Sequence, residues 1–123
     1  MLRLDSVIHL LQAQNHAIIL MLDANQAHQD CFLKSSIRPY SIEWLRIRRG
    51  LDDPFVTLTG CRPNSTTQTP CRDIDYVLTF SISIDSISTI PINCPAMSDH
   101  LGIILDIDLE NHFFFFLFRI AEP

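Results

Sequence analysis

The feature that most constrains this chain is a continuous apolar run over residues 17–22, which stops at Asp23-Ala24-Asn25. Its length suits a central strand buried on both faces. An amphipathic helix is predicted before it, over residues 2–14, because apolar side chains recur there at helical spacing. The order helix, short turn, buried strand is typical of an α/β arrangement, in which functional groups gather beyond the carboxyl ends of strands.

A second helix is predicted over residues 42–49, with Ser41 as its N-cap and Gly50 as its C-terminal stop. Residues 51–54 form a predicted turn, and residues 55–58 a predicted strand. Gly60, Pro63 and several Ser and Thr residues indicate a long loop over residues 60–71.

The clearest strand signal covers residues 74–80, where apolar and polar side chains alternate and leave one strongly apolar face. A weaker strand is predicted within residues 82–92, limited by Pro91, and another over residues 101–109. We therefore expect one α+β domain over residues 1–110. Residues 111–123, with the apolar run 113–118, form a predicted tail or edge strand that is an aggregation hazard.

Charge is distributed unevenly along a chain whose formal net charge is −5. Residues 1–72 have a net charge of +2 and residues 73–123 a net charge of −7. A phosphate-binding surface must therefore come from the first part, near Lys34, Arg38, Arg46, Arg48 and Arg49. The acidic second part fits either a divalent-cation site or a solvated surface.

The four cysteines do not have the spacing of a zinc site, and we interpret them as free thiols in a reducing, intracellular compartment. The apolar runs are far shorter than the roughly 20 residues of a membrane helix, so no membrane segment is predicted.

Three polar clusters lie at predicted strand ends: Asp23-Ala24-Asn25, Asp73-Ile74-Asp75-Tyr76 and Ser98-Asp99-His100. Taken singly, each has an ordinary explanation as a turn, a wet strand face or a surface pair. In this order they resemble the endonuclease/exonuclease/phosphatase family, whose fold is like that of pancreatic deoxyribonuclease. The sequences of residues 72–78 and 50–55 are most similar to the endonuclease domain of non-LTR retrotransposon reverse transcriptase polyproteins.

The resemblance implies a DNase I-like α/β/β/α sandwich, of which this chain would be the C-terminal half: one mostly antiparallel or mixed sheet with two helices. It also implies metal-dependent phosphodiester hydrolysis, with DNA as substrate and a nuclear location. Asp23 would orient and deprotonate the attacking water, and Asn25 would donate a hydrogen bond to that water or to a phosphoryl oxygen. His100 would bind the phosphate with its tautomer fixed by Asp75, and Asp99 would hold Mg²⁺ or Mn²⁺.

The family's metal-binding Asn and Glu belong to a first half that has no counterpart in this sequence. We therefore expect a truncated, inactive fragment whose inner sheet face meets water. Such a chain would be marginally stable, aggregate, or pair with a missing half or with itself. The arginine at the strand edge of many relatives is also displaced, since Asp73 stands at that position and Arg72 precedes it. Two alternatives remain: a non-catalytic remnant, and a half-domain that binds nucleic acid or a partner through the basic helix.

Overall fold

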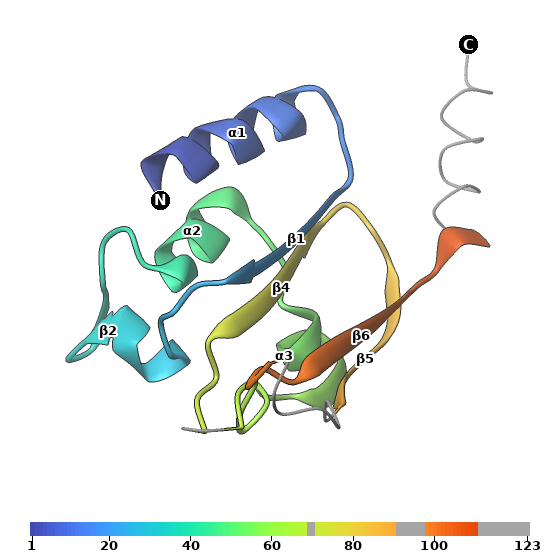
Figure 1. The fold of residues 1–123 in the computed structure, drawn as a ribbon. Helices are drawn as coiled ribbons and strands as arrows, with labels where there is room; N and C mark the ends of the chain where they lie inside the picture. The colour runs from blue at the N-terminus through green and yellow to red at the C-terminus, as the bar shows by residue number, and fades with distance from the viewer. Residues whose placement is uncertain (69–70, 91–97, 111–123) are drawn as a thin grey trace, which may run out of the picture.

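A computed structural model describes residues 1–68, 71–90 and 98–110 (Figure 1). The predictions for Cys94 and for residues 111–123 lie outside these ranges. The described elements follow the chain in the order α1 (Leu2–Ala13), β1 (Ile18–Asp23), the 3₁₀ turn η1 (His28–Cys31), β2 (Phe32–Leu33), β3 (Ser36–Ile37), α2 (Ile42–Arg49), α3 (Pro54–Thr59), β4 (Asp75–Phe80), β5 (Ile84–Ile90) and β6 (Gly102–Ile107).

The strands pair only in twos within the described residues, and all three pairs are antiparallel: β1 with β4, β2 with β3, and β5 with β6. The α+β class is confirmed at this level. The expectation of one sheet with two helices is wrong for the described part of the chain, which has three α-helices and three two-stranded sheets.

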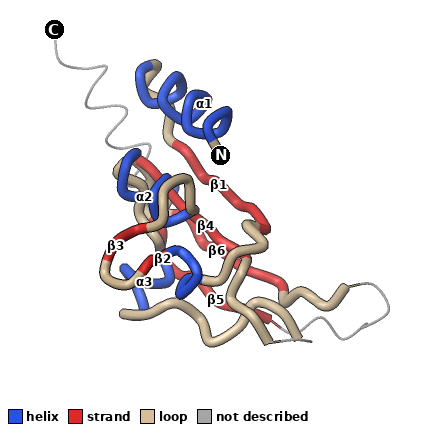
Figure 2. The backbone as a smooth tube through the Cα atoms, turned by 90° about the vertical axis from the view of Figure 1, so that its left-hand side faces the viewer, coloured by secondary structure: helices blue, strands red, loops and turns tan. Residues whose placement is uncertain are grey.

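The β1–β4 pair lies between two layers (Figures 1 and 2). One face packs on α1, α2 and η1 through a buried cluster that includes Ile8, Leu45 and Leu78. The other face packs on α3 and the β5–β6 hairpin through Phe55, Val77 and Ile87. Val77 is fully buried, so this face of β4 does not meet water as the sequence led us to expect, whereas Met21, its partner on β1, is 56% exposed.

The helix over residues 42–49 was predicted with the correct ends. The Ser41 hydroxyl accepts a hydrogen bond from the backbone N–H of Trp44 at 3.1 Å, and Gly50 closes the helix with φ +60°. The predicted strand over residues 55–58 is wrong, because these residues belong to helix α3. Asp53 caps that helix through the Phe55 N–H at 3.0 Å, and Pro54 at the first helical position suits the start of a helix better than a strand.

The two central strands differ from the prediction in how deeply their side chains are buried. Strand β1 was expected to be buried on both faces, but its Met21 is 56% exposed. Strand β4 was expected to have one apolar and one wet face, yet Tyr76, Val77, Leu78 and Thr79 are all buried. None of the helices in the described ranges has the length and apolar character needed to cross a membrane.

Candidate functional site

Two aspartates face each other at the end of the β1–β4 pair. Strand β1 ends at Asp23, strand β4 begins at Asp75, and the antiparallel register places these residues directly opposite each other. Partners in such a register project from the same face of a sheet. The backbone N–H of Ala24 donates to the Ile74 carbonyl at 2.9 Å and continues this alignment beyond the strands.

His100 reaches the same place from the loop before β6. Its Nδ1 lies 2.8 Å from Oδ2 of Asp75. Its Nε2 lies 3.8 Å from Oδ2 of Asp23 and 3.8 Å from Oδ1 of Asp99. Three clusters that are far apart in the sequence therefore meet around one imidazole ring.

The carboxylates around His100 favour its charged form. The pKa of His100 is raised, chiefly by the hydrogen bond to Asp75 and further by the negative charges of Asp75, Asp99 and Asp23, while partial desolvation acts in the opposite direction. One third of the side chain remains exposed (33%), so a ligand can reach it. At mildly acidic to neutral pH an imidazolium here can donate from Nδ1 to Asp75 and from Nε2 to an incoming anion.

Asn25 follows Asp23 in a tight turn of the backbone. Its φ is +46°, and its backbone N–H donates to Oδ1 of Asp23 at 2.7 Å. Asn and Asp are the residues that best tolerate this left-handed conformation and its local hydrogen bond. The Asn25 side-chain oxygen accepts a long hydrogen bond of 3.4 Å from Nη1 of Arg72.

Two pockets meet at this group of residues, and Asp23 and His100 line both of them. The first has a volume of about 250 Å³ and a partly apolar wall: Met21, Leu22, Asp23, Asp75, Tyr76, Val77, His100, Leu101 and Ile103. The second, of about 340 Å³, is more polar: Asp23, Asn25, Thr67, Arg72, Ile74, Asp99 and His100. All five predicted site residues therefore line one or both pockets.

The donor atoms fit a divalent cation in part. One carboxylate oxygen each from Asp23 and Asp75 and one ring nitrogen of His100 lie within 4.8 Å of one another. Hard cations such as Mg²⁺ prefer carboxylate oxygens and retain several waters. Asp75 is already engaged with His100, whereas the side chains of Asp23 and Asp99 are 48% and 64% exposed. The exposed pair would offer oxygens to a hydrated cation, and Asp99, the predicted metal ligand, lies at the outer rim outside the tight group of three.

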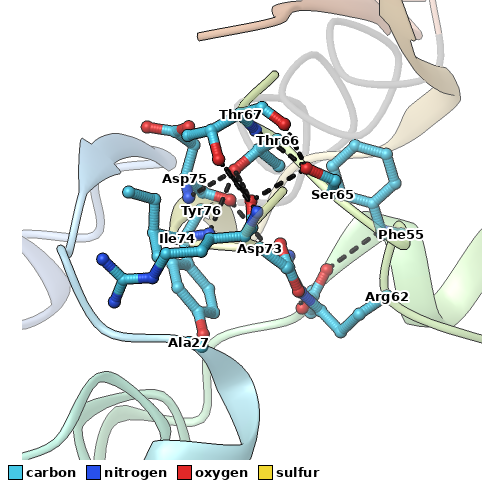
Figure 3. Close-up of polar contacts among 12 residues, drawn as sticks. Ala27, Phe55, Arg62, Ser65, Thr66, Thr67, Asp73, Ile74, Asp75 and Tyr76 are labelled. Carbon is cyan, nitrogen blue, oxygen red and sulfur yellow. Dashed lines mark hydrogen bonds and ion pairs between the residues drawn. The ribbon is translucent and has the colours of Figure 1, made fainter. Parts of the chain in front are cut away.

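Asp73 has a structural partner instead of a place in either pocket (Figure 3). Its carboxylate accepts two hydrogen bonds from the guanidinium of Arg62, at 2.9 Å and 2.5 Å. The same guanidinium pairs with Asp53 at 3.1 Å, donates to the Asp75 carbonyl at 2.8 Å, and lies 4.2 Å from the Tyr76 ring centroid. Arg72, not residue 73, is therefore the basic residue that lines the second pocket at this edge.

The basic helix is largely neutralised by ion pairs within the chain. Arg46 pairs with Glu43 at 2.6 Å, and Arg49 and Arg48 pair with Asp5 at 2.5 Å and 3.3 Å. Arg48 also stacks on Trp44 at 5.2 Å. A guanidinium that is held by a carboxylate has less positive potential to offer a phosphate backbone, which weighs against nucleic-acid binding through this helix.

Comparison with protein-family models, with curated proteins and with solved structures finds no match for this chain.

Arg62 and Thr66 are the important residues around the site that sequence reasoning missed. Both come from the loop over residues 60–71, where no periodicity marks a side chain as buried. The only available signal was the high density of Ser and Thr in that loop, which reads equally well as an ordinary turn.

Proposed function

We propose that this chain carries the acid–base and phosphate-binding part of a divalent-cation-dependent phosphodiesterase site of the endonuclease/exonuclease/phosphatase type, as in the endonuclease domains of non-LTR retroelements. The proposed substrate is DNA, and the proposed site of action is the nucleus. The observation that carries the proposal is the convergence of Asp23, Asp75 and His100 at the junction of two pockets.

The chemistry follows from the position of each group. Asp23 is an exposed carboxylate that lines both pockets, so it would orient a water and accept its proton. His100, held by Asp75, would donate from Nε2 to a phosphoryl oxygen, which requires the imidazolium that the surrounding carboxylates favour. Asn25 and Arg72 line the polar pocket beside it and would contribute neutral and charged donors to the phosphate.

A bound Mg²⁺ or Mn²⁺ would add charge stabilisation on the phosphoryl and leaving oxygens, with Asp99 as its carboxylate ligand. The oxygens of the described site cover only part of the octahedral shell of such a cation. Water, or a second chain that supplies further carboxylates, would complete it. Pairing with a separate N-terminal half or with a second copy is therefore part of the proposal.

Nicking of supercoiled plasmid tests the proposal directly. Purified chain with Mg²⁺ or Mn²⁺ is compared with the same reaction in EDTA, with His100→Ala and with the matched control His9→Ala, which removes an exposed histidine of α1. The sequence predicts that the chain is inactive by itself, so we expect nicking only where pairing completes the site. There the wild type and His9→Ala should nick, and His100→Ala should lose at least a hundredfold, in line with the usual contribution of acid–base groups of about 10²–10⁴-fold.

Two results would contradict the proposal. Equal nicking by His100→Ala would show that the activity does not use this site. The second result is a folded wild-type chain that does not nick DNA and shows no Mn²⁺-induced broadening of the His100 ring signals in NMR spectra. It would contradict both the proposed reaction and the proposed cation site.

A further inference from the structure

Thr66 is a fully buried threonine in a loop, and its hydroxyl group organises the start of strand β4 (Figure 3). The hydroxyl oxygen accepts hydrogen bonds from the backbone N–H groups of Ile74 and Asp75, both at 3.0 Å. It donates its own hydrogen to the Arg72 carbonyl at 3.3 Å. One side chain therefore fixes the backbone from which Asp75 projects.

The backbone of the same residue holds the loop that carries His100. The Thr66 carbonyl accepts from the N–H of Leu101 at 2.7 Å, next to His100 in the chain. Thr67 forms an isolated antiparallel bridge with His100, and the N–H of Gln68 donates to the Asp99 carbonyl at 2.6 Å. Residues 66–68 therefore run beside residues 99–101.

This connection matters because Asp75 and His100 belong to different sheets. Asp75 begins β4, which pairs with β1, whereas His100 leads into β6, which pairs with β5. The ladder hydrogen bonds of neither sheet fix the distance between the two side chains. Thr66 contacts both sides, with its hydroxyl on the Asp75 side and its carbonyl on the His100 side.

We propose that Thr66 is a positioning residue that sets the hydrogen bond between Asp75 and His100. The inference rests on the proposed function in so far as this pair is taken to be the reacting pair. Thr66 itself lines neither pocket and does not act on substrate. Its hydroxyl holds the backbone N–H of Asp75, and so places the carboxylate where Nδ1 of His100 can donate to it and Nε2 points into the site.

Substitution with valine isolates the hydroxyl from the volume of the side chain. Thr66→Val leaves the N–H groups of Ile74 and Asp75 without their acceptor in a buried place, so the start of β4 must move to find another. Thr66→Ser keeps the hydroxyl, and Thr66→Cys replaces it with a weak acceptor of similar size. Thr79→Val makes the same change at another buried threonine, which lies in β4 away from the pair.

The test is an NMR spectrum of chain labelled with ¹⁵N-histidine, recorded without substrate or cation. The Nδ1–H proton of His100 gives a deshielded signal while it is hydrogen-bonded to Asp75, and Asp75→Asn identifies that signal by shifting it. We expect Thr66→Val to shift the signal toward that of Asp75→Asn or to lose it to water exchange. Thr66→Ser and Thr79→Val are expected to keep the wild-type signal, and Thr66→Cys to lie between.

An unshifted signal in folded Thr66→Val would overturn the proposal. If the valine variant does not fold, Thr66→Cys decides in the same way. Because the signal is read without catalysis, a chain that nicks no DNA still tests Thr66. A chain that nicks DNA equally well with and without the hydroxyl would refute the positioning role alone and leave the proposed function intact.

Discussion

The aspartates around the site fall into two kinds according to their surroundings. The side chains of Asp53 and Asp73 are only 6% and 11% exposed, and both are neutralised by the buried guanidinium of Arg62. Asp23 and Asp99 are open to solvent and have no arginine partner in the described structure. Buried charges need a partner to be tolerated, so the first kind stabilises the fold and the second kind is available to a ligand.

His100 gives the chain a pH-dependent contribution to stability. Its folded-state pKa is raised, chiefly by Asp75, above an unfolded value of about 6.5. The stabilisation is therefore fully present below about pH 6.5 and is lost as the pH rises through the folded-state value. Since the side chain is 33% exposed, solvent screening keeps the effect small.

Urea unfolding in EDTA, from about pH 5 to about pH 9, measures this contribution. The midpoint of the wild type should exceed that of His100→Gln by most at the acidic end, and the difference should shrink toward the basic end. His9→Gln should follow the wild type at every pH. A difference that grows with pH would contradict the assignment.

At this scale the sequence was informative about the candidate site residues and silent about the residues that hold them in place. The resemblance to the endonuclease/exonuclease/phosphatase family predicted one site for Asp23, Asn25, Asp75, Asp99 and His100, and these residues line the same two pockets. Arg62 and Thr66 were missed because a loop side chain is buried by contacts with distant segments, which no local pattern encodes.

Among the elements, those with defined ends were the easiest to predict. Helix α2 has a capping serine, a C-terminal glycine and eight residues of helical pattern between them, and its bounds agree with the prediction. Helix α3 also has residues that mark its ends, with Asp53 before Pro54 and Gly60 after Thr59. Its six residues are mostly apolar or β-branched, however, which suggested a strand. Capping residues were the better guide there.

Removal of the α2 cap tests how much that end contributes. Ser41→Ala deletes the acceptor of the Trp44 N–H inside a buried position, so we expect a loss of roughly 1 kcal/mol in the free energy of unfolding. Ser35→Ala, at an exposed loop position, should change it by less than about 0.5 kcal/mol. Urea denaturation of both variants makes the comparison, and equal midpoints would show that the cap is replaced by water.

At the scale of the whole molecule, β4 is buried on both faces between two layers, and the site lies where the loop before β6 meets the end of the β1–β4 pair. The cluster of Phe55, Val77 and Ile87 joins β4 to α3 and the β5–β6 hairpin. His100 enters the site from the loop directly before β6. The sequence predicted the separate strands but not this pairing in twos, because the choice of partner depends on contacts between distant residues.

Weaker packing in the cluster of Phe55, Val77 and Ile87 should therefore change the environment of His100 as well as the stability of the fold. Ile87→Val removes one buried methylene group and should cost about 1 kcal/mol. Ile104→Val, at a 45% exposed position of the same hairpin, should cost less than about 0.5 kcal/mol. Thermal unfolding gives both values. The His100 ring signals should broaden in the first variant only, and broadening in both would assign the effect to the hairpin in general.

The register that sets Asp23 opposite Asp75 has a consequence for cation binding at the proposed site. Like charges directly opposite each other weaken a strand pair. A cation or an added proton between them relieves this repulsion, and any ligand that binds only the folded chain raises its stability. The melting temperature of this protein should therefore rise as the proposed site binds a cation, even when no phosphodiester bond is cleaved.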